Sequence, residues 1–265
     1  MRTTGVTVTI TGSETADILS CSLRILQERG GHRAASDDVL LAWAAIRARP
    51  DARRILELGS GKGTVALLLL RCLTTAKVVG IEAYEPHHEL AVRNAALNGL
   101  TERYDARYGD LREPRILDGE APFDLICGAP PYLPVGSGIL PGNPGRAVGR
   151  FELRGGVEAY VAAAVRHVAD GAPVVLLMDG RGRARAESAV SAAGLFACTR
   201  IAVRPRPERA PTYWLIVAGA RYFGTPVEEE VCMRLAAGME WSPAYAAIRE
   251  LLDLPRQAGG GADCL

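Results

Sequence analysis

A glycine-rich turn after an apolar run has the residue types of a cofactor-binding loop. The run reads Ile55-Leu56-Glu57-Leu58-Gly59-Ser60-Gly61-Lys62-Gly63. Glycines let the backbone approach a ligand closely, and the helix predicted to follow points its N–H groups toward that ligand. Glu82 ends the next predicted strand, where its carboxylate could hold ribose hydroxyls. These residues therefore predict a site for a ligand that contains a ribose.

The spacing of the glycines separates several kinds of site. A dinucleotide fingerprint needs Gly-x-Gly-x-x-Gly, but Thr64 stands where the last glycine is required. A Walker phosphate loop needs a further glycine at the position that Leu56 occupies. These mismatches argue against a dinucleotide site and against a Walker phosphate loop.

Two further features follow the turn in the order of an S-adenosylmethionine (SAM) site. Asp110 comes first, and the tetrapeptide Ala129-Pro130-Pro131-Tyr132 follows. This order makes methyl transfer from SAM, with S-adenosylhomocysteine as the product, the first interpretation. Residues 133–149, with five glycines and three prolines, form a loop where an acceptor must enter.

Composition excludes some classes of partner and leaves others open. The chain has 265 residues and a formal net charge of +1, so no overall field attracts a polyanion. A local basic face is still compatible with this balance. Lys62 and Lys77 are the two lysines in the sequence. Because every other basic residue except histidine is arginine, arginine clusters are weaker evidence for phosphate binding than usual.

The cysteines and the apolar runs indicate the compartment. The six cysteines are scattered, without a Cys-x-x-Cys pair, so we expect a reduced cytoplasmic protein without structural metal. Residues 1–13 lack the charged head and apolar core of a signal peptide. The apolar run at residues 65–70 is too short to span a membrane. We therefore expect neither secretion nor membrane insertion. The oligomeric state is left open.

Strand-like and helical patterns alternate along the middle of the chain. Nearly continuous apolar runs predict buried parallel strands at residues 53–58, 77–81, 123–127 and 173–178. Helices are expected at residues 64–74, 86–98 and 157–169. Residues 195–203 and 212–220 should pair as an antiparallel hairpin, because their connection is too short for a crossover helix. The expected fold is α/β and doubly wound, with a mostly parallel seven-stranded sheet and one antiparallel strand, the Rossmann-like class I SAM-methyltransferase arrangement.

Additional segments flank this core. We divide the chain into a cap or lid segment, a methyltransferase core and C-terminal helices with a flexible tail, at residues 1–50, 51–222 and 223–265. Ser36 is the expected N-cap of a helix at residues 37–47. Two small helices are expected at residues 226–238 and 243–254, and the glycine-rich tail at residues 257–265 is expected to be disordered.

Several segments together resemble the tRNA adenine-N6 methyltransferase family. They are the glycine turn, the tetrapeptide, the lead-in Leu23–Leu41, and residues 94–99 and 123–126. More broadly, the chain is similar to SAM enzymes with an Asn-Pro-Pro-Tyr motif, which include protein-glutamine methyltransferases. The resemblance covers residues 16–222.

The resemblance implies roles for particular residues. Gly59, Gly61 and Gly63 approach the methionine part of SAM, and Glu82 holds the ribose. Asp110 and the backbone of Leu111 read the adenine of SAM. The cofactor-binding set is completed by Glu57 and by Arg33 of the lead-in, which closes over SAM.

The tetrapeptide departs from the family at its first residue. Where the family has Asn, whose side-chain oxygen accepts a hydrogen bond from the target amine, this chain has Ala129. Pro130 still offers its carbonyl, and Tyr132 still offers an aromatic face for stacking. Loss of one positioned hydrogen bond costs about 10- to 1000-fold in rate, on the order of 1.5 to 4 kcal/mol.

Three explanations of Ala129 compete. The acceptor could lack an exocyclic amine, and we favour this one: a small planar nitrogen heteroaromatic, indole-like, methylated on ring carbon or nitrogen in specialised metabolism. The alternative is slow tRNA or RNA adenine-N6 methylation. The second alternative is a catalytically weakened module that binds SAM or RNA.

A ring-carbon acceptor would want a base, and four side chains are candidates. They are His32, Asp37, Tyr132 and Glu152. His87 and His88 begin a helix and are expected to be solvated. We assign the catalytic site to His32, Ala129, Pro130 and Tyr132.

An arginine cluster is the best sequence evidence for RNA. Seven arginines fall between residues 181 and 209: Arg181, Arg183, Arg185, Arg200, Arg204, Arg206 and Arg209. In an arginine-biased chain a solvated surface explains them as well as phosphate binding does. A small aromatic substrate is the favoured partner, and tRNA remains possible through this cluster.

Overall fold

The computed structural model describes residues 8–221, 224–257 and 262–263. The expectation of a disordered tail therefore falls mostly on residues outside these ranges. The described part of the C-terminal end carries two short strands, β11 (Arg256–Gln257) and β12 (Ala262–Asp263), which pair with each other.

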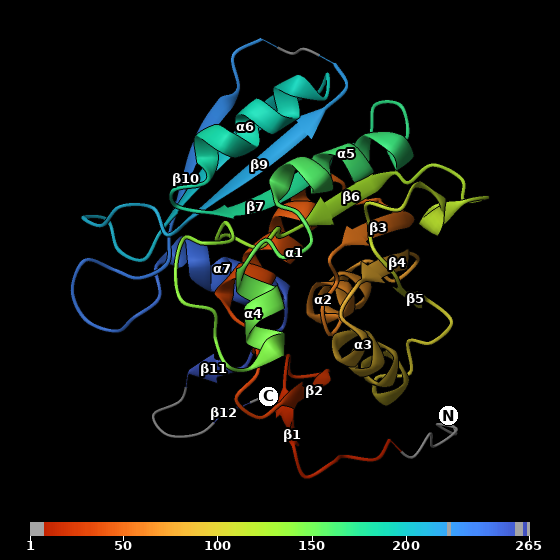
Figure 1. Cartoon of the computed structure of the whole chain (residues 1–265). Coiled ribbons are helices and arrows are strands. Elements are labelled where there is room, and N and C mark those ends of the chain that lie inside the picture. Colours follow the sequence, from red (N-terminus) through yellow and green to blue (C-terminus); the bar gives the residue numbers. More distant parts are fainter. Residues whose placement is uncertain (1–7, 222–223, 258–261, 264–265) are drawn as a thin grey trace.

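An eight-stranded sheet runs through the described part of the chain (Figure 1). Its strands are β3 (Arg54–Leu58), β4 (Lys77–Glu82), β5 (Tyr104–Tyr108), β6 (Leu125–Gly128), β7 (Val174–Asp179), β8 (Phe196–Arg204), β9 (Tyr213–Gly219) and β10 (Val227–Cys232). They lie in the order β10-β8-β9-β7-β6-β3-β4-β5. β9 is antiparallel to β7 and β8, and the other pairs are parallel. The expected mostly parallel sheet with one reversed strand is confirmed, with eight strands instead of seven.

The eighth strand is β10, for which we expected a helix. That expectation is wrong: residues 227–232 pair in parallel with β8 at the edge of the sheet. The strand contains three consecutive glutamates, and each forms an ion pair with an arginine. Arg200, Arg204 and Arg47 pair with Glu228, Glu230 and Glu229, respectively. Pairing on both sides of the strand explains why an acidic segment can lie extended here.

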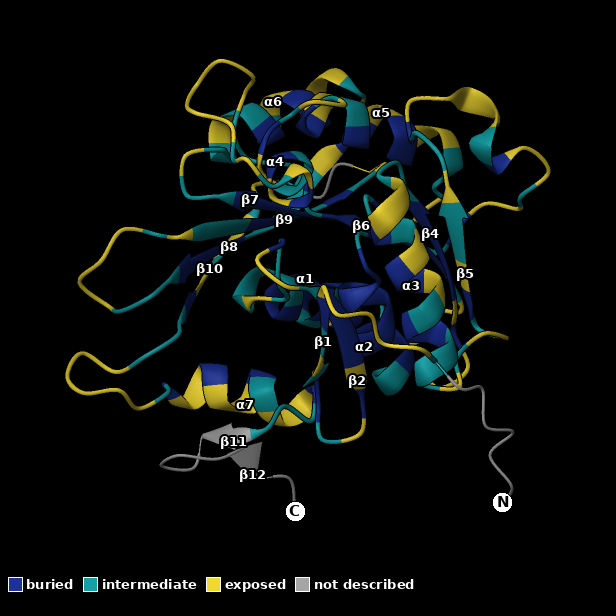
Figure 2. Cartoon of the chain, turned by 60° about the horizontal axis from the view of Figure 1, so that its bottom comes forward, coloured by how far each residue is buried: buried dark blue, intermediate teal, exposed yellow. Residues whose placement is uncertain are grey.

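Helices cover both faces of the sheet. They are α1 (Ser36–Ala48), α2 (Thr64–Cys72), α3 (Glu85–Leu97), α4 (Pro144–Arg150), α5 (Val157–His167), α6 (Arg183–Ala192) and α7 (Pro243–Leu251), with a short 3-10 helix η1 (Pro114–Leu117). One apolar core lies between the sheet and α1, α2 and α7, and the other between the sheet and α5 and α6. Buried residues concentrate in the central strands, α1 and α2 (Figure 2). Within the described ranges no helix is long and apolar enough to cross a membrane.

A hairpin that the sequence did not predict precedes α1. Strands β1 (Glu14–Ile18) and β2 (Arg24–Glu28) pair antiparallel. Asn94 of α3 holds β2, since its Oδ1 accepts from the Leu26 N–H at 2.7 Å and its Nδ2 donates to the Leu26 carbonyl at 3.2 Å. The same Nδ2 donates to the Lys62 carbonyl at 2.9 Å. One buried amide therefore ties the lead-in hairpin to the glycine turn.

The start of α1 differs by one residue from the expectation. Ala35, not Ser36, is the N-cap. The Ala35 N–H donates to Asp38 Oδ2 at 3.0 Å. Asp38 therefore closes the helix start from inside the first turn, and its carboxylate stays near the sheet edge where the glycine turn lies.

Candidate functional site

A pocket lies at the carboxyl ends of β3, β4 and β6, the edge of a parallel sheet where ligands commonly bind. The glycine turn after β3, Glu82 at the end of β4 and Asp110 after β5 line it. Residues 129–132 after β6 form a second wall. His32 and Asp37 come from the segment that leads into α1. The sheet topology thus gathers most of the expected site residues.

The three glycines of the turn serve different purposes. All have left-handed backbones, with φ of +66° at Gly59, +54° at Gly61 and +85° at Gly63. A Cβ at Gly59 would lie 2.1 Å from the Tyr160 hydroxyl, and one at Gly63 would lie 2.7 Å from the Tyr104 ring. A Cβ at Gly61 would meet nothing within 4 Å. Gly59 and Gly61 line the pocket and Gly63 does not, so Gly61 is the glycine that leaves open space for a ligand.

Glu82 holds the glycine turn in place. Its Oε2 accepts from the Gly61 N–H at 2.8 Å, and its Oε1 accepts from the Tyr84 N–H at 2.7 Å. Burial raises the pKa of this carboxyl, while the backbone donors oppose the shift. Each oxygen keeps a lone pair that a ligand hydroxyl can use.

Glu57 offers an unused acceptor deep in the pocket. The residue is 3% exposed, and its Oε2 has no hydrogen-bond partner in the structure. Burial, followed by the negative charge of Asp38, raises the pKa of Glu57 well above its usual value. A buried carboxyl oxygen without a partner is costly. Such a group indicates a place for a cationic or hydrogen-bonding ligand atom.

Asp110 is bound by its neighbour. Arg112 donates to both carboxylate oxygens, at 2.6 Å from Nη2 to Oδ2 and 3.0 Å from Nε to Oδ1. These bonds lower the pKa of Asp110. Leu111 is buried in the pocket wall, and its carbonyl accepts from Arg166 at 2.8 Å. Both expected adenine contacts therefore line the pocket, with the Asp110 carboxylate shared with an arginine.

Tyr132 is fixed by a residue from the lead-in. Its hydroxyl donates to Asp37 Oδ2 at 3.3 Å, and its ring packs against Tyr213 with 6.3 Å between ring centres. Burial and the negative charge of Asp37 raise the pKa of Tyr132 well above its usual value, so the hydroxyl stays protonated. Ala129 and Pro130 line the wall beside it.

Two histidines and a lysine lie together on the lead-in side. Burial and the Lys62 charge lower the pKa of His32. The Lys62 ammonium donates to the His32 carbonyl at 3.0 Å. The expectation that His87 is solvated is wrong: it is 5% exposed and lines the pocket, and burial lowers its pKa to about 3. His88 is half-buried, with Nε2 3.1 Å from the Ala106 carbonyl.

The sequence assigned no role to Lys62 or Asp38, which also line the pocket. Lys62 is 4% exposed, and its burial lowers its pKa. Asp38 has a pKa raised from 3.8 to about 7 by burial and by the charge of Asp37. A signal existed for Lys62, because a lysine within the glycine turn stands out in a chain with two lysines.

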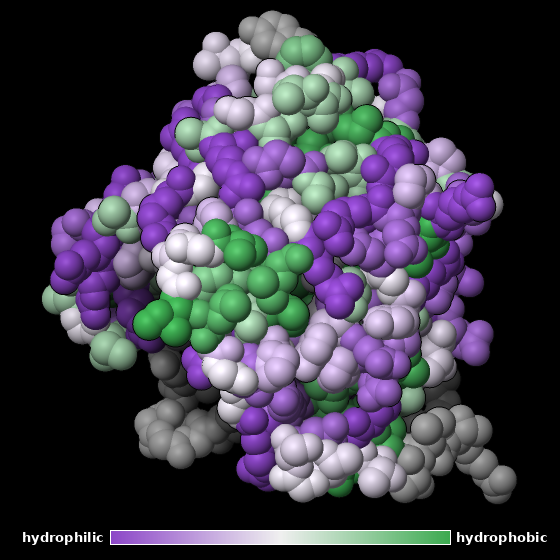
Figure 3. All heavy atoms as spheres, in the orientation of Figure 1, coloured by the Kyte–Doolittle hydropathy of each residue, from purple (hydrophilic) through white to green (hydrophobic). Residues whose placement is uncertain are grey.

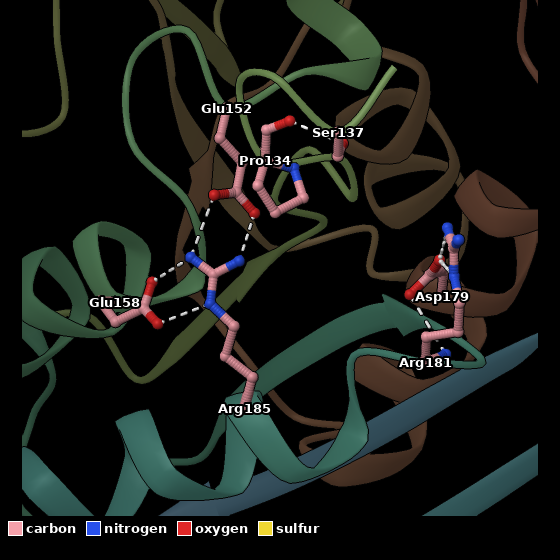
Figure 4. A network of polar contacts seen from close by, with 7 residues as sticks. All are labelled: Pro134, Ser137, Glu152, Glu158, Asp179, Arg181 and Arg185. Carbon is pink, nitrogen blue, oxygen red and sulfur yellow. Dashed lines mark hydrogen bonds and ion pairs between the residues drawn. The ribbon is translucent and has the colours of Figure 1, made fainter.

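Two expected site residues point elsewhere. Arg33 donates to Asp17 Oδ2 at 2.7 Å and to Thr15 Oγ1 at 3.0 Å, both on β1. Glu152 accepts two hydrogen bonds from Arg185, at 2.5 and 3.0 Å, as Figure 4 shows. Neither Arg33 nor Glu152 is among the residues that line the pocket. Glu152 is therefore poorly placed to serve as a base.

Most arginines of the cluster at residues 181–209 form ion pairs or hydrogen bonds within the chain. Arg181 pairs with Asp179, and Arg185 pairs with Glu152 and Glu158 (Figure 4). Four more make internal bonds, namely Arg183, Arg200 and Arg204 to glutamates and Arg206 to the carbonyls of residues 235, 236 and 238. These bonds explain the cluster without RNA.

Comparison with known proteins identifies the relatives of this chain, although no family model matches it. A tRNA1(Val) (adenine(37)-N6)-methyltransferase of Tolumonas auensis is 27% identical over 226 residues, which cover 84% of this chain and 91% of that protein. A release factor glutamine methyltransferase of Geobacter sulfurreducens is 38% identical over 98 residues, 37% of this chain. This second match spans a third of that relative's own length.

A solved structure supports the fold. A predicted O-methyltransferase of Agrobacterium tumefaciens superposes with a TM-score of 0.64 at 19% identity, covering 84% of this chain and 100% of that one. An enzyme of the methyltransferase class and SAM as its cofactor, both expected from the sequence, are confirmed at this level.

The expectation that the acceptor is a small nitrogen heteroaromatic is wrong. The relatives are named for methylation of tRNA and of protein glutamine, and none of these names describes a small heteroaromatic acceptor. The expected role in specialised metabolism depended on that acceptor and is withdrawn. The described chain has a class I methyltransferase fold and is similar to enzymes named as tRNA adenine-N6 methyltransferases and as protein glutamine methyltransferases.

Proposed function

We propose that the protein methylates the exocyclic amine of adenine in RNA, with tRNA as the favoured RNA and the cytoplasm as its place of action. The supporting observation is the extent of the match to a tRNA adenine-N6 methyltransferase, over 84% of this chain and 91% of that relative. The match to a glutamine methyltransferase covers 37% of this chain. The greater extent of the first match favours the tRNA substrate over a protein glutamine acceptor.

The pocket has features that fit SAM. Open space beside Gly61 admits the ligand close to the backbone. Glu82 would accept from the ribose hydroxyls with its remaining lone pairs, and the free Oε2 of Glu57 would accept from the ammonium group. The backbone of Leu111 would contact the adenine of the cofactor. When bound, SAM supplies a methyl carbon whose bond to sulfur breaks as the amine nitrogen forms the new bond, leaving a neutral thioether.

The wall after β6 would hold the acceptor. The Tyr132 ring provides a face for stacking of adenine, and the Pro130 carbonyl accepts a hydrogen bond from the target amine. Stacking and hydrogen bonding orient the nitrogen lone pair toward the methyl carbon, and alignment of this kind supplies much of the rate. No covalent bond to the enzyme is required. The methylated nitrogen finally releases a proton to the surroundings.

Transfer of labelled methyl from SAM tests the proposal. The purified protein is incubated with unmodified tRNA transcripts, and with a soluble protein extract in a parallel reaction. Digestion of the RNA should yield labelled N6-methyladenosine. Labelled methylglutamine in the protein fraction, with unlabelled RNA, would instead establish a glutamine methyltransferase and overturn the proposal.

A matched pair of variants ties the activity to this pocket. Glu82→Gln weakens the contacts to the turn and the ribose, and should lower SAM affinity about tenfold or more, as expected for a charged hydrogen bond. Glu85 lies three residues later on the exposed start of α3. Glu85→Gln should leave affinity and methylation unchanged. Equal behaviour of the two variants would place the cofactor elsewhere.

A further inference from the structure

Asp37 carries a buried carboxylate oxygen that nothing in the structure uses. Its Oδ2 accepts from the Tyr132 hydroxyl at 3.3 Å, whereas its Oδ1 is buried without a hydrogen-bond partner. Buried polar atoms are nearly always bonded, so an orphaned oxygen calls for an explanation. Asp37 lines the same pocket as Ala129 and Pro130. The residue that carries this unpaired oxygen therefore belongs to the pocket wall where the acceptor would bind.

This oxygen has the chemistry that Ala129 lacks. A carboxylate oxygen accepts hydrogen bonds from an amine as an amide oxygen does, and more strongly because it is charged. The bond from Tyr132 fixes the carboxylate beside the ring on which the acceptor would stack. Asp38 is a weaker candidate, because among the described residues the buried oxygens without a hydrogen-bond partner include Asp37 Oδ1 but neither oxygen of Asp38.

We propose that Asp37 Oδ1 accepts the hydrogen bond from the target amine that the missing side chain at Ala129 cannot accept. The role rests on the proposed function, since it needs an acceptor with an N–H donor. Asp37 orients the amine together with the Pro130 carbonyl and forms no covalent bond. The lone pair of the amine is thereby left free to face the methyl carbon.

A rescue experiment tests this role. Asp37→Ala should lower kcat for RNA methylation about tenfold or more, with SAM affinity by calorimetry within about twofold of the wild type. Adding Ala129→Asn to that variant should restore most of the lost kcat, because the amide replaces the acceptor. Asp37→Asn retains an oxygen of the same shape and should lose less activity than Asp37→Ala. Asp170→Ala removes an exposed carboxylate far from the pocket and controls for charge.

The outcomes separate this role from the proposed function. A wild type that methylates no RNA would refute both. Active wild type with an equally active Asp37→Ala variant would refute the role alone. Loss of SAM affinity in Asp37→Ala, or failure of Ala129→Asn to rescue a folded variant, would assign Asp37 to the cofactor or to structure instead.

A separate observation concerns three arginines near the pocket mouth. Arg146 and Arg150 lie on α4, and Arg154 follows four residues later and lines the pocket. All three are exposed, and none of their guanidinium groups forms a hydrogen bond or ion pair with another described residue. Val148 and Gly149 of the same helix line the pocket, so Arg146 and Arg150 lie beside it. The positive charges of Arg150 and Arg146 also lower the pKa of His32 in the pocket wall. In contrast, the cluster at residues 181–209 is mostly ion-paired.

We infer that these three arginines contact phosphates of the RNA whose adenine enters the pocket. Unpaired guanidinium groups beside a binding site suit phosphate, which they bind in bidentate fashion. This inference rests on the proposed RNA substrate but is independent of Asp37. It moves the expected RNA surface from residues 181–209 to α4 and the segment after it.

Charge reversal with a matched control tests the surface. The double variant Arg146→Glu/Arg150→Glu should weaken tRNA binding about tenfold or more and lower the slope of log affinity against log salt by about one per lost phosphate contact. SAM affinity should not change. Arg181→Glu/Arg209→Glu makes the same change in net charge within the cluster and should have a smaller effect. Equal losses in both variants would indicate only nonspecific attraction, and a larger loss in the control would restore the cluster as the RNA surface.

Discussion

The Tyr160 hydroxyl lies directly beneath the glycine turn, where a Cβ on Gly59 would approach it to 2.1 Å. Tyr160 is buried on α5, and burial raises its pKa, so the hydroxyl remains neutral. Gly59 is therefore required by packing as well as by its left-handed backbone. Gly61, two residues later, has a similar backbone but no neighbour at that distance.

This difference predicts different consequences for two similar substitutions. Gly59→Ala should lower the free energy of unfolding by about 2 to 4 kcal/mol, the sum of backbone strain and overpacking. Gly61→Ala should cost about 1 to 2 kcal/mol from strain alone, but should weaken SAM binding because the methyl group enters the pocket. Chemical denaturation and calorimetry measure the two effects. Equal destabilisation by both substitutions would show that the Tyr160 side chain moves to accommodate a Cβ at position 59 without a free-energy penalty.

The local motifs of the site were predictable from the sequence because their chemistry is local. A strand, a glycine turn and a helix specify the loop, and parallel strands bring Glu82 and residues 129–132 to one edge. The features of the site that could not be predicted depend on contacts between segments that are distant in sequence. The Tyr132 hydroxyl meets Asp37, which is 95 residues away in sequence. Sequence patterns do not encode such partners.

Burial explains other misassignments. His87 follows a helix start that is usually exposed, yet the pocket and α4 bury it: a Cβ at Gly145 would lie 3.1 Å from its Nε2. The edge strand β10 lies within residues 226–238, where a helix is expected from the sequence. Its pairing depends on arginines of β8 and α1. In these cases tertiary packing outweighed the local pattern.

Binding of SAM should release a proton through Glu57. Because the pKa of Glu57 is raised by burial, its carboxyl keeps its proton to a higher pH than an ordinary glutamate does. A bound ammonium group stabilises the carboxylate and lowers that pKa, so affinity should rise with pH toward the pKa of the free protein and then level off. Calorimetry in two buffers with different ionisation enthalpies measures the proton count. Glu57→Gln should abolish the release, and an unchanged count in that variant would assign the proton to another group.

Asp38 should make stability depend on pH. Its pKa is raised from 3.8 to about 7, so the folded protein binds more protons than the unfolded chain between these values. The contribution of Asp38 to the free energy of unfolding therefore falls as pH rises from 3.8 to about 7. Asp38→Asn keeps an acceptor for the Ala35 N–H and removes the titration. The Tm of the variant relative to wild type should be higher at pH 7 than at pH 4. Asp51→Asn, which removes a carboxylate that is 76% exposed, is the matched control.

The loop before α4 should become ordered when RNA binds. We expected the whole segment 133–149 to be a loop, but its last third is helical, beginning at the Asn143 cap, and Asn143 Nδ2 donates to Glu28 at 3.2 Å. Residues 134–142 retain the glycines and prolines of a mobile segment.

This loop forms an apolar surface patch that includes Val135, Ile139 and Leu140 (Figure 3). The Ile139 residue is 96% exposed. If the acceptor packs on this patch, amide exchange at residues 134–142 should slow when tRNA and S-adenosylhomocysteine are both present, while exchange in α5 should not change. Ile139→Ser should raise the KM for tRNA without lowering Tm, because the side chain makes almost no contact in the free protein. Equal exchange in free and bound protein, together with an unaltered KM, would exclude the loop from acceptor binding.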